Sequence, residues 1–160
     1  MPKTQIIHMI GHSTHSLSAF IALLRQHSVE LVVDVRTKPL SRRVPQFNKA
    51  RLEASLRENG IEYQWERTLG GFQPMACSEI LQVIERLLCA QQGLCFMCSE
   101  SDFRKCHRHY LLAPLLQGLG YRIYQILPDG EVVEDVHLLP LRRKAPQQES
   151  ACRPFNIPRQ

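Results

Sequence analysis

Residues 93–109 read GLCFMCSESDFRKCHRH, a short apolar run followed by a polar loop rich in cysteine and histidine. The run at 93–97 follows a glycine and is almost wholly apolar, which is typical of a strand buried on both faces. Apolar residues then recur at helical spacing from about residue 105 to residue 117, where Gly118 ends the pattern. Pro114 is predicted to kink this helix, because it removes a backbone donor. A strand that leads through a polar loop into a helix indicates an α/β fold.

The rest of the chain repeats this alternation of strand and helix. Further strands are predicted at residues 5–10, 30–36, 61–66, 121–127 and 131–134. Further helices are predicted after the N-cap Ser16, at residues 48–59 after the cap Asn48, and from Ser78, with Leu81, Ile84, Leu87 and Leu88 on one face of the last. Strands that alternate with helices form a mostly parallel sheet covered on both faces. We therefore predict a three-layer α/β/α domain with a roughly five-stranded sheet.

The two ends of the chain differ from this pattern. Pro128-Asp129-Gly130 is a strong turn signal, so the last two strands are predicted to form a C-terminal hairpin at the sheet edge. The single domain is expected to span residues 1–140. Residues 141–160 contain three prolines and five basic residues against one acid, so +4 of the net charge of +5 lies there. We interpret this segment as a flexible basic tail.

The sequence gives no sign of export or of a membrane span. No apolar stretch approaches the ~18 residues that a transmembrane helix needs. The apolar run near the N-terminus is short and lacks a small-residue cleavage site, so it does not resemble a secretory signal. A cytoplasmic location is the expectation, with no membrane partner. The six cysteines are then interpreted as thiols rather than disulfides.

Polar side chains gather where three of the predicted strands end. In open α/β sheets, ligands bind beyond the carboxyl ends of the strands, where loops lead into helices. The residues that share this position are His12 and Ser13 after the first strand, Asp34, Arg36, Ser41 and Arg42 after the second, and Cys98, Glu100, Cys106, His107 and Arg108 after the fourth. We expect these three loops to meet in one site.

The same loops resemble the domain-of-unknown-function 488 family. The resemblance covers roughly residues 5–127, and its most specific part is a Cys-His-Arg element behind a Cys-x-Glu strand end. The residues that carry it are Gly11-His12-Ser13, Asp34-Val35-Arg36, Pro39, Ser41, Arg42, Phe47, the segment 63–70, Cys98-x-Glu100 and Cys106-His107-Arg108. The resemblance implies an α/β fold and marks the three loops as characteristic. It implies no reaction, because the family is defined without one.

Metal binding is one chemistry open to this site. Cys98, Cys106 and His107 have the ligand types that zinc takes, and His12 is a possible fourth ligand. Cys95 would not join them, because residues three apart on a strand face opposite sides of the sheet. The sequence does not settle whether a metal or any other cofactor is bound.

Thiol catalysis is a second possibility. The spacing from Cys98 to Arg104 is C-x5-R, as in phosphatase and rhodanese loops, where backbone N–H groups cradle an oxyanion. Glu100 and Asp102 lie within this loop, and it has no glycine. Their carboxylates would repel a phosphate, so we interpret the spacing as a coincidence.

A third chemistry is a phosphate clamp. Arg36, Arg42 and Arg108 would bind the anion, with His12, Ser13 and Ser41 as further substrate-binding residues. The catalytic candidates are Asp34, Cys98, Glu100 and His107. Purely structural roles stay open: Asp34 and Arg36 could pair at the sheet end, and Cys98 and Cys106 could be buried small residues.

These observations lead to two functional hypotheses. The first is a small cytoplasmic enzyme that acts on a phosphate-bearing or nucleotide-like substrate at the three strand-end loops. The alternative is a noncatalytic nucleic-acid-binding module, because residues 36–57 carry seven basic residues against one acid and the tail is also basic. A small anionic ligand is the expected partner in the first case, and nucleic acid in the second. The sequence indicates no oligomeric state.

Overall fold

A computed structural model describes residues 5–71, 76–90 and 93–137 of the chain. Strands and helices alternate along it, as the sequence predicts. The strands are β1 Ile6–Gly11, β2 Leu31–Asp34, β3 Glu62–Trp65, β4 Leu94–Cys98, β5 Arg122–Ile126 and β6 Val132–Glu134. The helices are α1 Leu17–Gln26, α2 Lys49–Glu58, α3 Cys77–Ala90 and α4 Ala113–Gly118, with shorter turns at Pro45–Phe47, Arg67–Leu69, Phe103–Lys105 and Arg108–Leu112.

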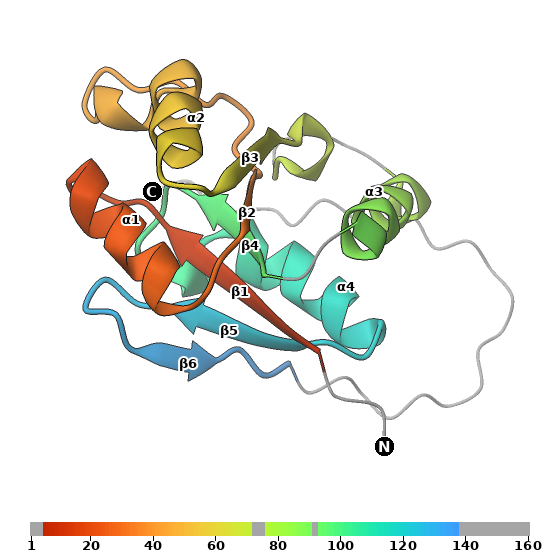
Figure 1. Cartoon of the computed structure of the whole chain (residues 1–160). Helices are drawn as coiled ribbons and strands as arrows, with labels where there is room; N and C mark the ends of the chain where they lie inside the picture. Colours follow the sequence, from red (N-terminus) through yellow and green to blue (C-terminus); the bar gives the residue numbers. More distant parts are fainter. Residues whose placement is uncertain (1–4, 72–75, 91–92, 138–160) are drawn as a thin grey trace, which may run out of the picture.

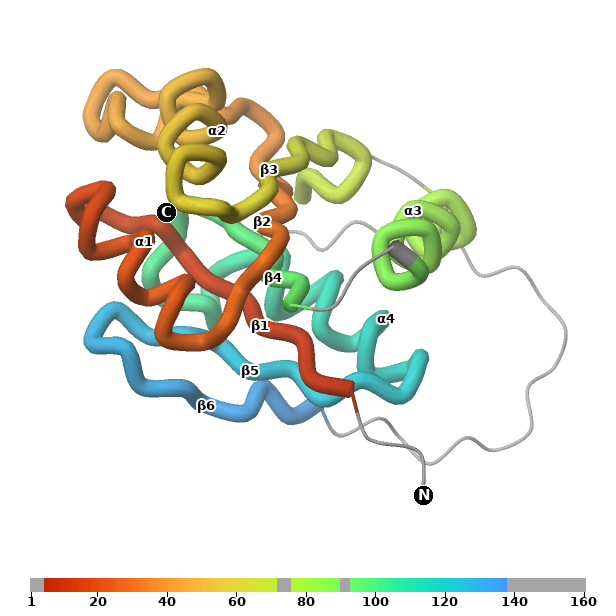
Figure 2. Tube along the Cα trace, in the orientation of Figure 1, coloured from red at the N-terminus to blue at the C-terminus, as the bar shows by residue number. Residues whose placement is uncertain are grey.

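The six strands form one sheet in the order β3-β2-β4-β1-β5-β6 (Figure 1). Strands β1 to β5 are parallel, with β1 between β4 and β5 in the middle of the sheet (Figure 2). Strand β6 is antiparallel to β5 and pairs Glu134 with Tyr124. The mostly parallel sheet with a C-terminal hairpin edge is therefore confirmed.

Helices cover both faces of this sheet, which gives the three layers. Helices α1 and α2 lie on one side, and α3 and α4 on the other (Figure 1). Strand β4 shows how one strand serves both layers, because successive side chains point to opposite faces. Phe96 and Cys98 belong to the core under α3 and α4. Cys95 and Met97 belong to the core under α1 and α2.

The N-caps of the first two helices differ. Ser16 caps α1 as predicted, and its Oγ accepts a hydrogen bond from the Ala19 N–H at 3.2 Å. Asn48 occupies the cap position of α2, but its side chain makes no capping bond. Its Oδ1 instead accepts from the backbone N–H of Ser41 at 2.6 Å. Asn48 therefore fixes the loop that follows β2.

One detail of the predicted helices is wrong, and the kink predicted at Pro114 comes with a change of helix type. On α3 the buried side chains are Ile80, Ile84 and Leu87, whereas Leu81 is only partly buried, since the inward stripe starts one residue earlier. The helix predicted near residues 105–117, with a kink at Pro114, consists of a π turn at Arg108–Leu112 and α4, preceded by a 3₁₀ turn at Phe103–Lys105. Pro114 supplies the reason, because it has no N–H for an α-helical bond. The Ala113 N–H bonds the Arg108 carbonyl, five residues back.

Within the described residues, no helix has the length and apolar character of a membrane span. The predicted tail at residues 141–160 lies outside the described part of the chain.

Candidate active site

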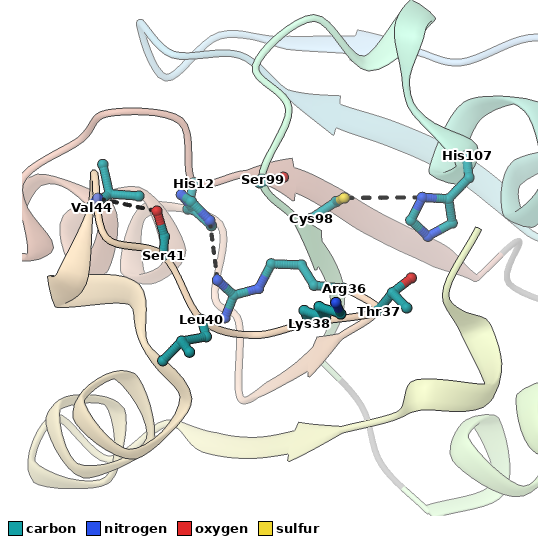
Figure 3. A pocket seen from close by; sticks show the side chains of 10 residues that line it. All are labelled: His12, Arg36, Thr37, Lys38, Leu40, Ser41, Val44, Cys98, Ser99 and His107. Carbon is teal, nitrogen blue, oxygen red and sulfur yellow. Dashed lines mark hydrogen bonds between the residues drawn. The ribbon is translucent and has the colours of Figure 1, made fainter. Parts of the chain in front are cut away.

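A cavity of about 620 Å³ opens at the carboxyl ends of β1, β2 and β4 (Figure 3). It has the size of a pocket for a small molecule. Its lining combines basic, hydroxyl, sulfur and apolar side chains: His12, Arg36, Thr37, Lys38, Leu40, Ser41, Val44, Cys98, Ser99 and His107. The three strand-end loops predicted to meet thus contribute to one cavity.

The first and third of these loops are held together by backbone contacts. The N–H groups of His12 and Ser13 donate to the carbonyls of Cys98 and Ser99 at 2.9 and 3.0 Å. Ser13 adopts a φ of 47°, in the left-handed region that residues other than glycine rarely occupy. At Gly11, a Cβ atom would lie 1.8 Å from the carbonyl oxygen of Glu100. This close approach explains why a glycine precedes His12.

Asp34 forms a buried ion pair with Arg36 at the end of β2. Its Oδ1 accepts from Arg36 Nε at 2.9 Å, and its Oδ2 from Arg36 Nη2 at 2.6 Å. The hydroxyl of Tyr63 donates to the same Oδ2 at 2.6 Å. Burial and the neighbouring Asp34 charge raise the pKa of Tyr63, so this hydroxyl stays protonated as a donor. Asp34 has no exposed surface, and its contacts make it a positioning residue for Arg36.

Arg36 in turn fixes the protonation state of His12. Arg36 Nη1 lies 3.2 Å from His12 Nε2, and an arginine can only donate, so Nε2 is the acceptor. Nδ1 therefore carries the proton and donates to the Ser13 carbonyl at 2.9 Å. Burial, followed by the Arg36 charge, lowers the pKa of His12 and favours this neutral form. The ring also stacks on Phe47 at a centroid distance of 4.3 Å.

The guanidinium of Arg36 retains one donor for a ligand. It has five N–H groups, and four of them are directed at Asp34 twice, at His12 and at the Phe47 carbonyl. The second N–H of Nη1 takes part in none of these four bonds, and the Tyr63 hydroxyl also interacts with the guanidinium. Burial opposes the charge, but the hydrogen bonds and charge of Asp34 outweigh it and raise the pKa of Arg36. A fixed cation with a spare donor therefore lies on the cavity wall.

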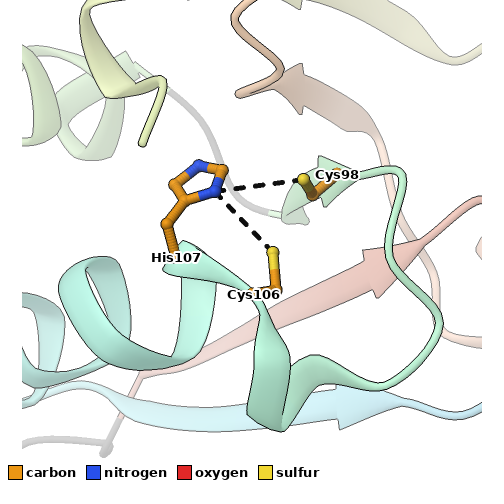
Figure 4. Close-up of side chains that lie close together, drawn as sticks. All are labelled: Cys98, Cys106 and His107. Atoms are coloured by element: carbon orange, nitrogen blue, oxygen red, sulfur yellow. Dashed lines mark hydrogen bonds between the residues drawn. The ribbon is translucent and has the colours of Figure 1, made fainter. Parts of the chain in front are cut away.

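Cys98, Cys106 and His107 form a compact cluster (Figure 4). His107 Nδ1 lies 4.0 Å from the sulfur of Cys98 and 3.7 Å from that of Cys106. Both cysteines are buried, with 7% and 4% of their surfaces exposed. Of the two, Cys98 lines the cavity. The hydrogen bond from the Cys106 thiol and the proximity of His107 lower the pKa of Cys98, whereas the Cys98 neighbour and burial raise that of Cys106.

The loop that follows β3 packs against the imidazole of His107 at Gly71. A Cβ atom on Gly71 would lie 2.7 Å from both Cβ and Cγ of His107, so this glycine lets the loop pack on the ring. His107 Nε2 is buried and has no hydrogen-bond partner among the described residues. Nδ1 is therefore the nitrogen of His107 that faces the two sulfurs, and Nε2 takes no part in the cluster.

Other predicted site residues lie away from the cavity wall. Arg108 is 1% exposed, and it donates from Nε to Gln125 Oε1 and from Nη1 to the Glu100 carbonyl. The Glu100 side chain is exposed and accepts from the Asp102 N–H. Arg42 is also exposed, and neither it nor Ser13 is among the lining residues. Arg108 thus fixes the loop after β4.

Sequence reasoning missed several lining residues. Thr37 and Lys38 directly follow Arg36 in the loop after β2, which the sequence predicts as part of the site. Their position next to Arg36 could therefore have identified them as lining residues. Tyr63 does not line the cavity, but its hydroxyl bonds Asp34 and so supports Arg36. Ser99 lies beside Cys98. Leu40 and Val44 supply apolar surface, which residue chemistry alone does not mark.

Comparison with protein families identifies one match. A family described as "Domain of unknown function DUF488" matches residues 16–77. The resemblance to DUF488 is confirmed. The matched segment contains Asp34, Arg36 and the loop after β2, whereas Cys98 and His107 lie outside it. No curated protein and no solved structure matches the chain.

Proposed function

We propose that this DUF488-like protein is a small enzyme that acts on a phosphate-bearing or nucleotide-like molecule bound in the cavity. One observation carries the proposal: Arg36, Cys98 and His107 line the same cavity. Arg36 has a spare N–H donor, and Cys98 and His107 belong to the cluster with Cys106. A fixed cation in the same cavity as a reactive cluster suits an anionic substrate.

The charge of the cavity wall supports an anionic ligand. Arg36, which is paired with the buried Asp34, and Lys38 are the two cations of the wall, and none of the ten lining residues is acidic. Thr37, Ser41 and Ser99 add hydroxyl groups that can bond phosphate or sugar oxygens. Leu40 and Val44 supply apolar surface on which the less polar part of such a ligand, for example a nucleotide base, could pack. This combination fits a mononucleotide or a phosphorylated metabolite.

The Cys98–Cys106–His107 cluster is the proposed reactive centre. Its cavity-facing members, Cys98 and His107, are two of the predicted catalytic residues. Two chemistries are available to it, attack by the Cys98 thiolate or activation of a water by a metal held between the three side chains. Asp34 acts on this site only through Arg36, and we assign it no contact with the substrate.

Binding of AMP and inorganic phosphate, measured by isothermal titration calorimetry, tests the anion site. Lys38→Ala is expected to weaken AMP binding on the order of 5-fold, since an exposed ion pair contributes up to about 1 kcal/mol. Lys49→Ala is the matched control, because Lys49 is an exposed cation that lies over the Trp65 ring and does not line the cavity. Failure of both probes to bind, or an equal effect of the two substitutions, would contradict the proposal.

A nucleic-acid-binding module is a second candidate, favoured by one observation. Six basic residues of the 36–57 segment are exposed: Lys38, Arg42, Arg43, Lys49, Arg51 and Arg57. Oligonucleotide affinity measured against salt concentration tests it, because phosphate contacts give a steep slope. Binding that is salt-dependent, insensitive to Cys98→Ser and weakened equally by Lys38→Ala and Lys49→Ala would favour the module over the enzyme.

A further inference from the structure

We propose that Cys98, Cys106 and His107 bind one zinc ion, with a fourth coordination position open to the cavity. The proposal concerns the reactive centre of the proposed enzyme and rests on that function for the role of the open position. The reactive group of the centre would then be a metal-bound water or a metal-bound substrate oxygen, and not a free Cys98 thiolate.

The separations within the cluster are those of zinc ligands. Bond lengths of about 2.3 Å for Zn–S and about 2.05 Å for Zn–N, at tetrahedral angles, place sulfur and nitrogen about 3.6 Å apart. His107 Nδ1 lies 3.7 Å from the Cys106 sulfur and 4.0 Å from the Cys98 sulfur. The ligand atoms of all three residues lie within 4.8 Å of one another. Figure 4 shows both sulfurs on the same side of the imidazole, facing Nδ1.

Hydrogen bonding alone accounts poorly for this arrangement. A neutral imidazole nitrogen has one lone pair, so Nδ1 can fully accept from only one thiol, and the Cys106 thiol also hydrogen-bonds the Cys98 sulfur. Hydrogen bonds therefore join these three groups only in pairs. A cation between the three atoms satisfies them together, because both thiolates and the nitrogen lone pair point at it.

The surroundings leave the fourth position to a ligand rather than to His12. Both nitrogens of His12 are engaged, Nε2 by Arg36 and Nδ1 by the Ser13 carbonyl. Cys98 and His107 line the cavity. Three protein ligands with one open position are the pattern of catalytic zinc sites. Arg36 lines the same cavity and supplies a cation to its wall.

A second cluster in the chain provides a contrast. His109 Nδ1 lies 2.8 and 3.0 Å from the two carboxylate oxygens of Asp135, which are direct hydrogen-bond distances. His137 Nε2 lies 3.2 Å from the same carboxylate. His109 thus bonds the Asp135 carboxylate directly, and Gln125 Nε2 donates to the same carboxylate at 2.8 Å, so its oxygens are engaged without an ion. His109 is therefore a suitable control residue.

Titration of the reduced full-length chain with Co²⁺, followed by competition with Zn²⁺, tests the proposal. One equivalent of Co²⁺ is expected to bind, with a thiolate-to-cobalt charge-transfer band and the intense d–d bands of tetrahedral cobalt. Zn²⁺ is expected to displace it. Cys106→Ser and His107→Ala should lose this equivalent. Cys89→Ser and His109→Ala should retain it, since Cys89 is an exposed thiol and His109 belongs to the other cluster.

The wild-type spectrum by itself decides the inference even where a variant fails to fold. A wild-type chain that shows no charge-transfer band with Co²⁺ would overturn the zinc site, as would full retention of the band in Cys106→Ser. AMP binding without any metal binding would leave the proposed function standing and remove the metal. Metal binding without AMP or phosphate binding would remove the proposed function and leave the zinc site.

Discussion

The buried ion pair between Asp34 and Arg36 leads to a quantitative prediction for Asp34→Asn. The carboxylate accepts four hydrogen bonds: three from Arg36, through its backbone N–H, Nε and Nη2, and one from Tyr63. An amide of the same size removes the charge and turns an NH₂ group toward these donors. Arg36 would then be a cation with 6% exposure and no anionic partner among the described residues.

Breaking a buried pair by removing one partner costs about 3–5 kcal/mol, because an uncompensated charge stays buried. For a chain of this length each kcal/mol lowers the melting temperature by about 2–4 °C. We therefore expect Asp34→Asn to lower it by roughly 6–20 °C. Tyr63→Phe removes one hydrogen bond to the carboxylate and leaves the pair, so its cost should be about 1.5–3 kcal/mol.

Urea unfolding followed by circular dichroism gives the free energies of unfolding for this comparison. The matched control is Glu53→Gln, which breaks the exposed Arg57–Glu53 pair on α2, where 77% of the arginine side chain and 37% of the glutamate side chain are accessible. This change should cost about 0.5 kcal/mol or less. If Asp34→Asn lies within about 1 kcal/mol of the wild type, Asp34 is not the buried partner that holds Arg36.

Two further predictions concern the strands that flank the site. Gly11→Ala should destabilise the chain by more than the ~1–3 kcal/mol typical of overpacking, because the new Cβ would lie 1.8 Å from the backbone oxygen of Glu100. The control is Gly118→Ala on α4, where a Cβ meets nothing within 4 Å. In the same urea assay, this control should be neutral or stabilising. Equal free energies for the two variants would count against the close approach of β1 to the loop after β4. Iodoacetamide at neutral pH should alkylate exposed Cys89 and leave Cys95 unmodified until the protein unfolds, since Cys95 has no exposed surface and burial raises its pKa. Mass spectrometry of the labelled peptides measures this, and modification of both cysteines at one rate would contradict the position of Cys95 under α1 and α2.

The sequence by itself determined the elements of the fold and the region of the site. Apolar periodicity, the cap at Ser16 and the turn at Pro128-Asp129-Gly130 act over a few residues, so they can be interpreted without the rest of the chain. The rule that ligands bind at the carboxyl ends of parallel strands then indicated the loops containing His12, Arg36 and Cys98.

The tertiary structure decided which side chains in those loops face the cavity. Arg36 and Arg108 look alike in the sequence, since each is an arginine in a polar loop at a strand end. Arg36 lines the cavity, whereas Arg108 is engaged by Gln125 and the Glu100 carbonyl. These partners are 17 and 8 residues away along the chain, and Tyr63 is 29 residues from Asp34. Such contacts depend on strand order and packing, which local propensity does not encode.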